Sequence, residues 1–197
     1  MNDYLNFELE MILKGKEYLF ENIIQLRYSN IYKDITIPHL IKWKEISIDG
    51  LFIIKSGKSL IKNEQKKGKI PFIGSSSSNN GITNFVSNKN ETFSQNLLGL
   101  NSNGSVGDCF YHPYFCLFSS DVKRLFLKHK EGNKYIYLFL KTCILQQKEK
   151  YSYGYKLNEK RMRQQKIKVP MTKDNEVDYT YMENYMKWIE KKLLLKK

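Results

Sequence analysis

The chain has 197 residues, of which 41% are hydrophobic and 14% aromatic, so it can bury one core and is not an intrinsically disordered polypeptide. It carries 33 lysines and arginines against 20 aspartates and glutamates, a formal net charge of +13. This excess favours a polyanionic partner such as nucleic acid or an acidic membrane surface. The alternative is a soluble protein whose surface is merely basic.

Hydropathy and cysteine content bear on the compartment. No stretch approaches the roughly 18 uninterrupted apolar residues of a membrane-spanning helix, so we expect no membrane partner. Acidic residues precede the first basic one at the amino terminus, which is the wrong polarity for a signal peptide. The three cysteines, spread through the chain, form no disulfide framework. We therefore expect a cytoplasmic protein.

Residues 1–40 are predicted to form an N-terminal helical segment and a connector. Apolar residues recur at helical spacing across residues 2–28, with a break near Gly15. The segment holds four basic and six acidic residues, a net charge of −2, whereas the rest of the chain carries +15. Because the sign of the charge changes there, we expect a domain to begin near Ile41.

The start of this domain alternates in hydropathy. Apolar residues between positions 43 and 54 fall at a period of two on either side of Asp49-Gly50, which predicts a strand, a turn and a second strand. The following Ser56-Gly57-Lys58-Ser59 lacks the earlier glycine of a phosphate-binding P-loop, so we expect no nucleotide site of that kind.

Two loops rich in small polar residues come next. Residues 74–81 consist only of Gly, Ser and Asn and lie between two short apolar runs. We predict a polar loop held at both ends by strands, with a flexible linker as the alternative. A second Gly/Asn/Ser loop, residues 101–107, also follows an apolar run.

Basic residues are concentrated in two blocks. Residues 55–69 hold six lysines against one glutamate, and residues 148–173 hold nine basic residues against two glutamates. Between the blocks, residues 71–121 are nearly neutral. This arrangement suits phosphate contacts on either side of a neutral reading surface, although solvated basic faces would give the same pattern.

The second half of the chain is predicted to contain the remaining core. Residues 109–118 suggest a core strand, Asn133 is expected to cap a central helix over residues 134–147, and residues 167–170 suggest another strand. Thr180 and Glu183 form a capping-box pair before a last helix. An apolar seam on that helix, which could pack on its own domain, on the N-terminal helices or on another chain, comprises Met182, Met186, Ile189 and Leu193.

No catalytic or metal-binding constellation is evident. The spacing of Cys109, His112 and Cys116 matches no usual zinc site, and the three histidines stand in no recognisable nucleophile context. Asp49 and Glu64 nominally fit a metal-dependent nuclease, but Glu64 lies in a wholly polar stretch and not on a rigid strand. The chain also lacks an Asn-Pro-Pro-aromatic motif, so we do not expect it to transfer methyl groups by itself.

A series of short motifs runs in order from residue 41 to about residue 190. These motifs are Trp43-Lys44-Glu45-Ile46, Phe52-Ile53-Ile54-Lys55-Ser56-Gly57-Lys58, Ile70-Pro71-Phe72-Ile73-Gly74, Asn79-Asn80-Gly81-Ile82, Asn103-Gly104-Ser105-Val106-Gly107, Phe118-Ser119-Ser120-Asp121-Val122, Asn133-Lys134-Tyr135-Ile136, Tyr153-Gly154, Arg161-Met162 and Lys168-Val169-Pro170. Each is weak alone. In this order and spacing they resemble the target recognition domain of type I restriction-modification specificity subunits, and similar modules of some single-chain type II restriction-methylation enzymes.

The resemblance implies an α/β (α+β) fold. Residues 41–172 would be a mixed-sheet DNA target recognition domain with a central helix, and residues 173–197 a spacer or dimerisation helix. Such a subunit reads one half of a split double-stranded DNA sequence and has no catalytic centre. Its partners are a DNA adenine methyltransferase subunit and a restriction subunit, and S-adenosylmethionine, ATP and Mg²⁺ would belong to those partners.

The length departs from the family's usual plan, because a complete specificity subunit has two recognition domains and two spacer helices. Our hypothesis is a half-subunit that pairs with a second copy, as a homodimer through its terminal helices, or with a methyltransferase subunit. A two-fold symmetric pair would read a palindromic split site.

Two sets of side chains are the candidate DNA contacts. The candidates for base readout are amide and hydroxyl groups of the polar loops and one aromatic ring of the Tyr-rich segment, residues 151–155. They are Ser76, Ser77, Asn79, Asn80, Asn101, Asn103 and Tyr153. Cations of the two basic blocks are the candidates for phosphate contact, namely Lys58, Lys62, Lys66, Lys67, Lys156, Arg161, Arg163 and Lys166.

Two other functions stay open at this point. One is a stand-alone interaction protein that redirects or blocks a methyltransferase. The other is a nuclease that uses Asp49 and Glu64.

Overall fold

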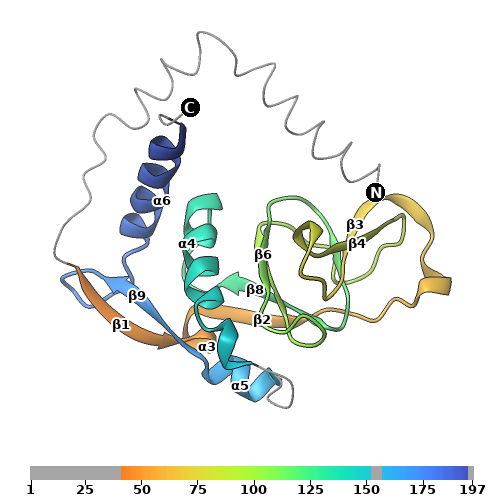
Figure 1. Cartoon of the computed structure of the whole chain (residues 1–197), viewed down its shortest axis with the longest axis horizontal. Coiled ribbons are helices and arrows are strands. Elements are labelled where there is room, and N and C mark those ends of the chain that lie inside the picture. Colours follow the sequence, from red (N-terminus) through yellow and green to blue (C-terminus); the bar gives the residue numbers. More distant parts are fainter. Residues whose placement is uncertain (1–40, 152–156, 195–197) are drawn as a thin grey trace, which may run out of the picture. The chain divides into compact units, whose positions relative to one another are not determined.

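The computed structural model describes residues 41–151 and 157–194 of the chain (Figure 1). The helices predicted within residues 2–28, and the candidate site residues Tyr153 and Lys156, lie outside the described residues. In chain order the elements are β1 (Lys42–Ser47), α3 (Ile48–Leu51), β2 (Phe52–Ser56), η1 (Lys62–Glu64), β3 (Lys67–Ile73), η2 (Asn79–Gly81), β4 (Ile82–Val86), β5 (Leu97–Asn101), β6 (Cys109–His112), β7 (Leu117–Phe118), β8 (Val122–Leu127), α4 (Lys134–Leu145), η3 (Lys148–Lys150), α5 (Glu159–Gln164), β9 (Lys166–Met171) and α6 (Tyr179–Leu194).

The largest sheet has four strands in the order β2-β8-β5-β6, and all neighbouring pairs are antiparallel. All five residues of β5 are buried, as expected for an interior strand with a continuous apolar run. A three-stranded sheet, β4-β3-β7, combines an antiparallel with a parallel pair. The prediction of a mixed-sheet α+β fold is therefore confirmed.

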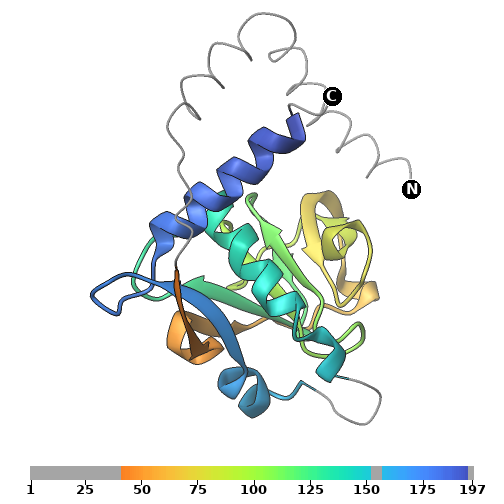
Figure 2. The ribbon, with the colours of Figure 1, turned by 60° about the vertical axis from the view of Figure 1, so that its left-hand side comes forward.

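Helix α4 is the central helix that the sequence predicts. The Asn133 side chain caps it by accepting hydrogen bonds from the backbone amides of Tyr135 and Ile136, at 3.0 and 3.1 Å. The helix lies across the large sheet (Figure 2), where it contacts β5, β6 and β9. Its buried face includes every residue predicted for it, namely Ile136, Phe139, Leu140, Cys143 and Ile144.

The strand, turn and strand predicted between residues 43 and 54 exist, but the two strands do not pair with each other. β1 pairs with β9 in a two-stranded ribbon, whereas β2 pairs with β8 in the large sheet. The turn between them is the short helix α3, in which Ile48 and Leu51 are both buried. Because α3 is anchored in the core at both ends, the strands diverge from it.

The described residues divide into two compact units, one made of residues 41–183 and one that contains the part of α6 from Asn184 onward. The first unit extends beyond the expected boundary at residue 172. The capping-box prediction is wrong, because Asp178 accepts the hydrogen bond from the Tyr181 amide at 2.8 Å. Glu183 instead accepts a hydrogen bond from the Asn133 side chain at 2.9 Å.

Met182 has a different environment from the one expected for an interface seam. It belongs to the first unit and is completely buried, with 0% of its surface exposed. Leu193, in the second unit, is 63% exposed. The seam available to a partner is therefore shorter than the sequence suggests.

None of the helices in the described ranges is long and apolar enough to cross a bilayer. Cys109, Cys116 and Cys143 are free and buried. Burial raises the pKa of the Cys109 thiol to about 12 and also raises that of the Cys116 thiol.

His112 is also a core residue. Its ring packs edge-on against Phe118, with centroids 5.2 Å apart, and lies directly over Gly99, where an added Cβ would come within 2.8 Å of Nε2. Burial, aided by the charge of Lys141, lowers the pKa of His112 to about 3. The imidazole is therefore neutral at neutral pH and unsuited to acid–base chemistry.

We predict that His112 contributes to acid destabilisation. The unfolded histidine has a pKa of about 6.5, so between pH 6.5 and about 3 the unfolded chain binds a proton that the folded domain excludes. In His112→Leu, the unfolding free energy measured in urea should fall less steeply below pH 6.5, by up to about 1.4 kcal/mol per pH unit. Equal slopes for the two proteins would contradict this.

Candidate nucleic-acid interface

The first loop (residues 74–81) joins β3 to β4, as predicted. The Gly74 amide donates to the Gly81 carbonyl at 2.9 Å and closes the hairpin. Asn79, Asn80 and Gly81 have φ angles of 52°, 53° and 77°. Asn and Gly adopt this left-handed region at the lowest cost, which explains the Asn-Asn-Gly sequence.

Asn80 fastens the first loop to the large sheet. Its Nδ2 donates to the Tyr111 carbonyl at 3.2 Å and to the Tyr114 hydroxyl at 2.9 Å, and the residue is half-buried. The sequence had placed Asn80 among the base-reading residues. Because its amide donors are engaged within the domain, its role in this structure is to support the loop.

The second loop (residues 101–107) lies directly against the first. The Ser75 hydroxyl donates to the Asn103 carbonyl, and Nδ2 of Asn101 donates to the Ser76 carbonyl at 3.0 Å. Asn101 is only 1% exposed, so the structure does not support its predicted role in base readout. It ends β5 and holds the loops together. The two loops therefore form one surface, which the sequence alone did not indicate. We call it the two-loop surface.

The remaining polar side chains of the two-loop surface differ in whether they form hydrogen bonds within the domain. Ser77 and Asn79 are exposed, and their side chains make no hydrogen bond to the described part of the chain. The Ser76 hydroxyl lies 3.1 Å from that of Ser78. Asn103 is exposed, and its Nδ2 donates to Asp121 at 3.2 Å. Ser77 and Asn79 are therefore the best-placed groups for an external ligand.

The first basic block lies away from the two-loop surface. Lys62, Lys66 and Lys67 are exposed, but they lie in η1, just before β3 and at its start, and the seven residues of β3 separate them from the first loop by roughly 20 Å. Lys58 forms an exposed ion pair with Glu91 at 3.0 Å. The backbone amide of Glu91 and the Lys58 ammonium hold the pKa of that carboxyl below its usual range.

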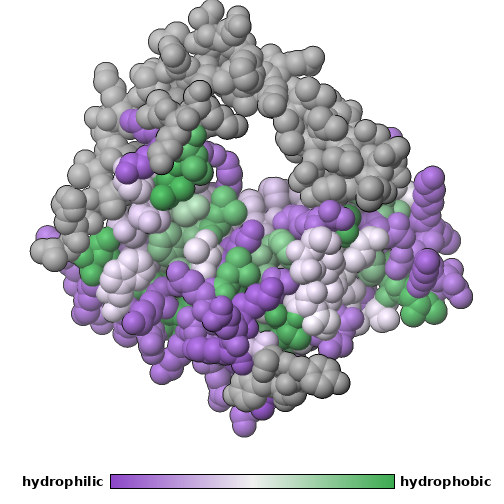
Figure 3. Space-filling view, in the orientation of Figure 1, coloured by the Kyte–Doolittle hydropathy of each residue, from purple (hydrophilic) through white to green (hydrophobic). Residues whose placement is uncertain are grey.

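The second basic block contains α5 and the start of β9. In Figure 3 the strongly hydrophilic surface lies over α5 and, at the other side, over the segment around η1, with paler surface between them. Asn158 caps α5 by accepting a hydrogen bond from the Arg161 amide at 2.9 Å. Exposed cations therefore lie on both sides of a less polar central surface.

Arg163, predicted to contact phosphate, is engaged by two carboxylates of the domain. Its guanidinium binds Asp49 at 2.6 Å and Glu159 at 2.8 Å, which ties α5 to α3 and holds the pKa of Glu159 below its usual range. Because these carboxylates already hold Arg163, it is less available for a phosphate contact than an unpaired cation would be. The same ion pair engages Asp49, the acid on which the nuclease alternative depends.

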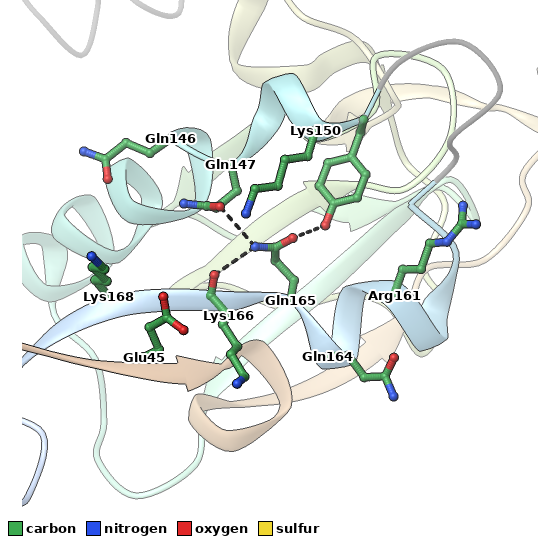
Figure 4. A pocket seen from close by; sticks show the side chains of 10 residues that line it. Glu45, Gln146, Gln147, Lys150, Arg161, Gln164, Gln165, Lys166 and Lys168 are labelled. Atoms are coloured by element: carbon green, nitrogen blue, oxygen red, sulfur yellow. Dashed lines mark hydrogen bonds between the residues drawn. The ribbon is translucent and has the colours of Figure 1, made fainter.

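Arg161 and Lys166, by contrast, line an open cleft of about 570 Å³ between the ends of α4 and α5 and the β1–β9 ribbon (Figure 4). Lys150 and Lys168 add two more cations to its walls, and Glu45 is the one carboxylate in the lining. We call this the glutamine cleft, because its other polar side chains are mainly Gln146, Gln147, Gln164 and Gln165.

Gln165 organises the floor of the glutamine cleft. It accepts a hydrogen bond from the Tyr151 hydroxyl, and its Nε2 donates to the Lys166 carbonyl at 2.8 Å and to Gln147 at 3.4 Å (Figure 4). Its backbone carbonyl accepts from the Ile48 amide at 2.8 Å. The sequence interpretation missed these residues. The only signal was a Gln-Gln pair at the end of each helix, beside lysines and arginines.

An ion pair connects the glutamine cleft to the two-loop surface. Lys148, in η3, binds the partly buried Asp108 at 2.6 Å, immediately after the second loop. Gly107 lies against Lys148, where an added Cβ would come within 3.2 Å of Cγ. The two candidate surfaces therefore belong to one compact unit and are joined by this contact.

In the described residues, no group of three His, Cys, Asp or Glu side chains is arranged to hold a metal ion. Asp49 and Glu64 lie in separate elements, α3 and η1. Cys109, His112 and Cys116 are buried core residues.

The sequence places the chain in a family of DNA-specificity domains. Residues 41–196 match the type I restriction modification DNA specificity domain, and the chain belongs to this family. It is 45% identical, over 98% of its length, to the type II restriction enzyme BgcI specificity subunit S.BcgI of Heyndrickxia coagulans. It spans about half of that relative, since the match covers 55% of it.

Solved structures share the fold. The S subunit of a type I system from M. genitalium aligns with 99% of this chain and 52% of its own, at a TM-score of 0.58 and 18% identity. The HsdS subunit from Thermoanaerobacter tengcongensis aligns with 97% of this chain and 47% of its own, at 0.57 and 11%.

We predict that Arg163→Ala lowers the midpoint of thermal unfolding by about 2–4 °C, because it removes the link between α5 and α3 and leaves two carboxylates together. The matched control is Lys160→Ala, on the same helix and exposed, which should leave the midpoint unchanged. An unchanged midpoint in Arg163→Ala would return this residue to the candidates for phosphate contact.

Proposed function

We propose that the chain is a sequence-specific DNA-recognition subunit, or a recognition half of one, in a restriction-modification system. The observation that carries the proposal is the two-loop surface, supported by membership of the specificity family. It presents the neutral amide and hydroxyl groups of Ser77 and Asn79, which can discriminate base edges. Its anchoring to β5 and β6 fixes these groups before DNA arrives.

Cations on either side of this surface would supply the phosphate contacts. Arg161 and Lys166 stand in the glutamine cleft, and Lys62, Lys66 and Lys67 stand at the far end of β3. Phosphate contacts fix the position of a protein on the duplex but carry no sequence information. We therefore assign positioning to the cations and base discrimination to the neutral two-loop surface.

We further propose that the chain reads one half of a split target. The relative and the S subunits that it resembles are about twice its length. A second copy, or a second recognition domain, would read the other half. Met186, Ile189 and Leu193 recur on one face of α6 and are the candidates for joining copies through terminal helices.

In this proposal the chain recruits its catalysts. A DNA adenine methyltransferase subunit would bind S-adenosylmethionine, and a restriction subunit would use ATP and Mg²⁺. The chain itself would need no cofactor. Because the substrate is cellular DNA, we expect it to work in the cytoplasm.

The test is selection from a library of randomised duplexes by the full chain. We expect the wild type to enrich one short motif. Ser77→Ala with Asn79→Gly should loosen the preference at adjacent positions by about tenfold or more, and leave binding to unselected DNA within about twofold. Glycine is chosen at position 79 because the φ angle there is 52°.

The matched control is Ser59→Ala with Asn63→Ala, two exposed residues outside the loops, which should enrich the wild-type motif. Equal loss on selected and random DNA in the loop variant would remove this surface from base readout. If the wild type enriched nothing but bound an adenine methyltransferase, the stand-alone interaction protein would be the better description.

A further inference from the structure

The glutamine cleft contains more than phosphate-binding groups. Gln147 and Gln165 are hydrogen-bonded to each other and hold the floor. Gln146 and Gln164 are exposed, and their side-chain amides make no hydrogen bond within residues 41–151 and 157–194. A glutamine amide offers a donor beside an acceptor, the pair that matches the N6 and N7 edge of adenine.

These two glutamines stand at opposite ends of the cleft, with Lys150, Gln165 and Lys166 between them and their amides directed outward (Figure 4). Gln146 follows the last residue of α4, and Gln164 is the last residue of α5. An extended ligand that crosses the cleft would therefore meet an amide, then cations, then an amide.

The charge of the cleft favours an anion in its centre. Lys150, Lys166 and Lys168 form no ion pair within the described residues, although Glu45 lies opposite Lys168 in the β1–β9 ribbon. With Arg161, four cations face one carboxylate. Part of this charge offsets the negative ends of α4 and α5, but the excess remains.

The cleft is also preorganised and suitably placed. Tyr151 and Gln147 hold Gln165, so the floor needs no ordering when a ligand binds. The volume of about 570 Å³ is that of a small-ligand site, enough for a short piece of one strand but not for a duplex. The ion pair of Lys148 with Asp108 joins this wall to the two-loop surface, so one DNA molecule can touch both.

We propose that the glutamine cleft is a second DNA-reading site. Lys150 and Lys166 hold a phosphodiester of one strand, and Gln146 and Gln164 each read the edge of a flanking base, with adenine preferred. The inference rests on the proposed function and adds specificity-determining residues to it.

The test uses the full chain and the same randomised duplexes. Gln146→Ala and Gln164→Ala should each loosen one position of the enriched motif by about tenfold, and the two positions should differ. Gln164→Glu should move the preference at its position from adenine towards cytosine, whose N4 amine a carboxylate accepts. Substitution of a residue that only supports the fold would not change the preferred base from adenine to cytosine.

The cations have a different expected signature. Lys166→Gln should weaken binding to all sequences. The slope of the logarithm of the DNA-binding constant against the logarithm of the salt concentration should become less negative by about 0.9. The matched controls are Gln95→Ala and Lys173→Gln, both exposed and outside the cleft, which should enrich the wild-type motif with the wild-type salt slope.

The outcomes separate this inference from the proposed function. Gln146 and Gln164 variants that enrich the unaltered motif would overturn the cleft and leave the proposed function intact. The side-chain amide NMR signals of Gln146 and Gln164 in the wild-type chain test DNA contact in the cleft independently. The probes are an unselected duplex and adenosine monophosphate. Signals unmoved by the duplex would overturn the cleft, and so would signals that only the mononucleotide moves. Signals moved by the duplex when no motif is enriched would support DNA contact in the cleft and overturn the proposed function.

Discussion

The candidate DNA surface depends on the burial of β5. This strand lies between β8 and β6 with every residue buried, and its last residue, Asn101, remains inside the domain although it is polar. A buried amide is costly unless it is hydrogen-bonded, and Nδ2 of Asn101 donates to the backbone of the first loop, whereas its buried Oδ1 has no hydrogen-bond partner in the described residues. One hydrogen bond from a buried side chain therefore helps to fix where two exposed loops meet.

The same arrangement explains how short polar loops can be specific. Ser-, Gly- and Asn-rich segments are usually mobile, because they bury little apolar surface. Here the first loop is closed at its base by the hydrogen bond between Gly74 and Gly81 and fastened to the large sheet by Asn80, next to that base. Exposed groups on such a loop keep a fixed geometry, which lowers the entropic cost of reading a base.

The sequence predicted elements whose signals are local. Asn133 caps α4 through amides two and three residues away, and the first loop is recognisable from the strands that border it.

Contacts between residues far apart in the sequence were not predictable. Arg163 binds Asp49, 114 residues away, so it is indistinguishable in sequence from a solvent-facing cation. Asn101 and Asn103 are neighbours of the same kind, yet only the structure shows that one is buried and the other exposed. The glutamine cleft joins residues of β1, of the segment after α4, of α5 and of β9, and no single segment reveals it.

The backbone of the first loop has a consequence for how such a domain diversifies. The left-handed turn and the bonds of Asn80 maintain the shape of the loop, whereas Ser77 is exposed and lies outside the turn. A substitution of Ser77 changes the chemical group on display without touching the residues that build the scaffold. Under the proposed function, such a substitution is a single step towards a new sequence preference.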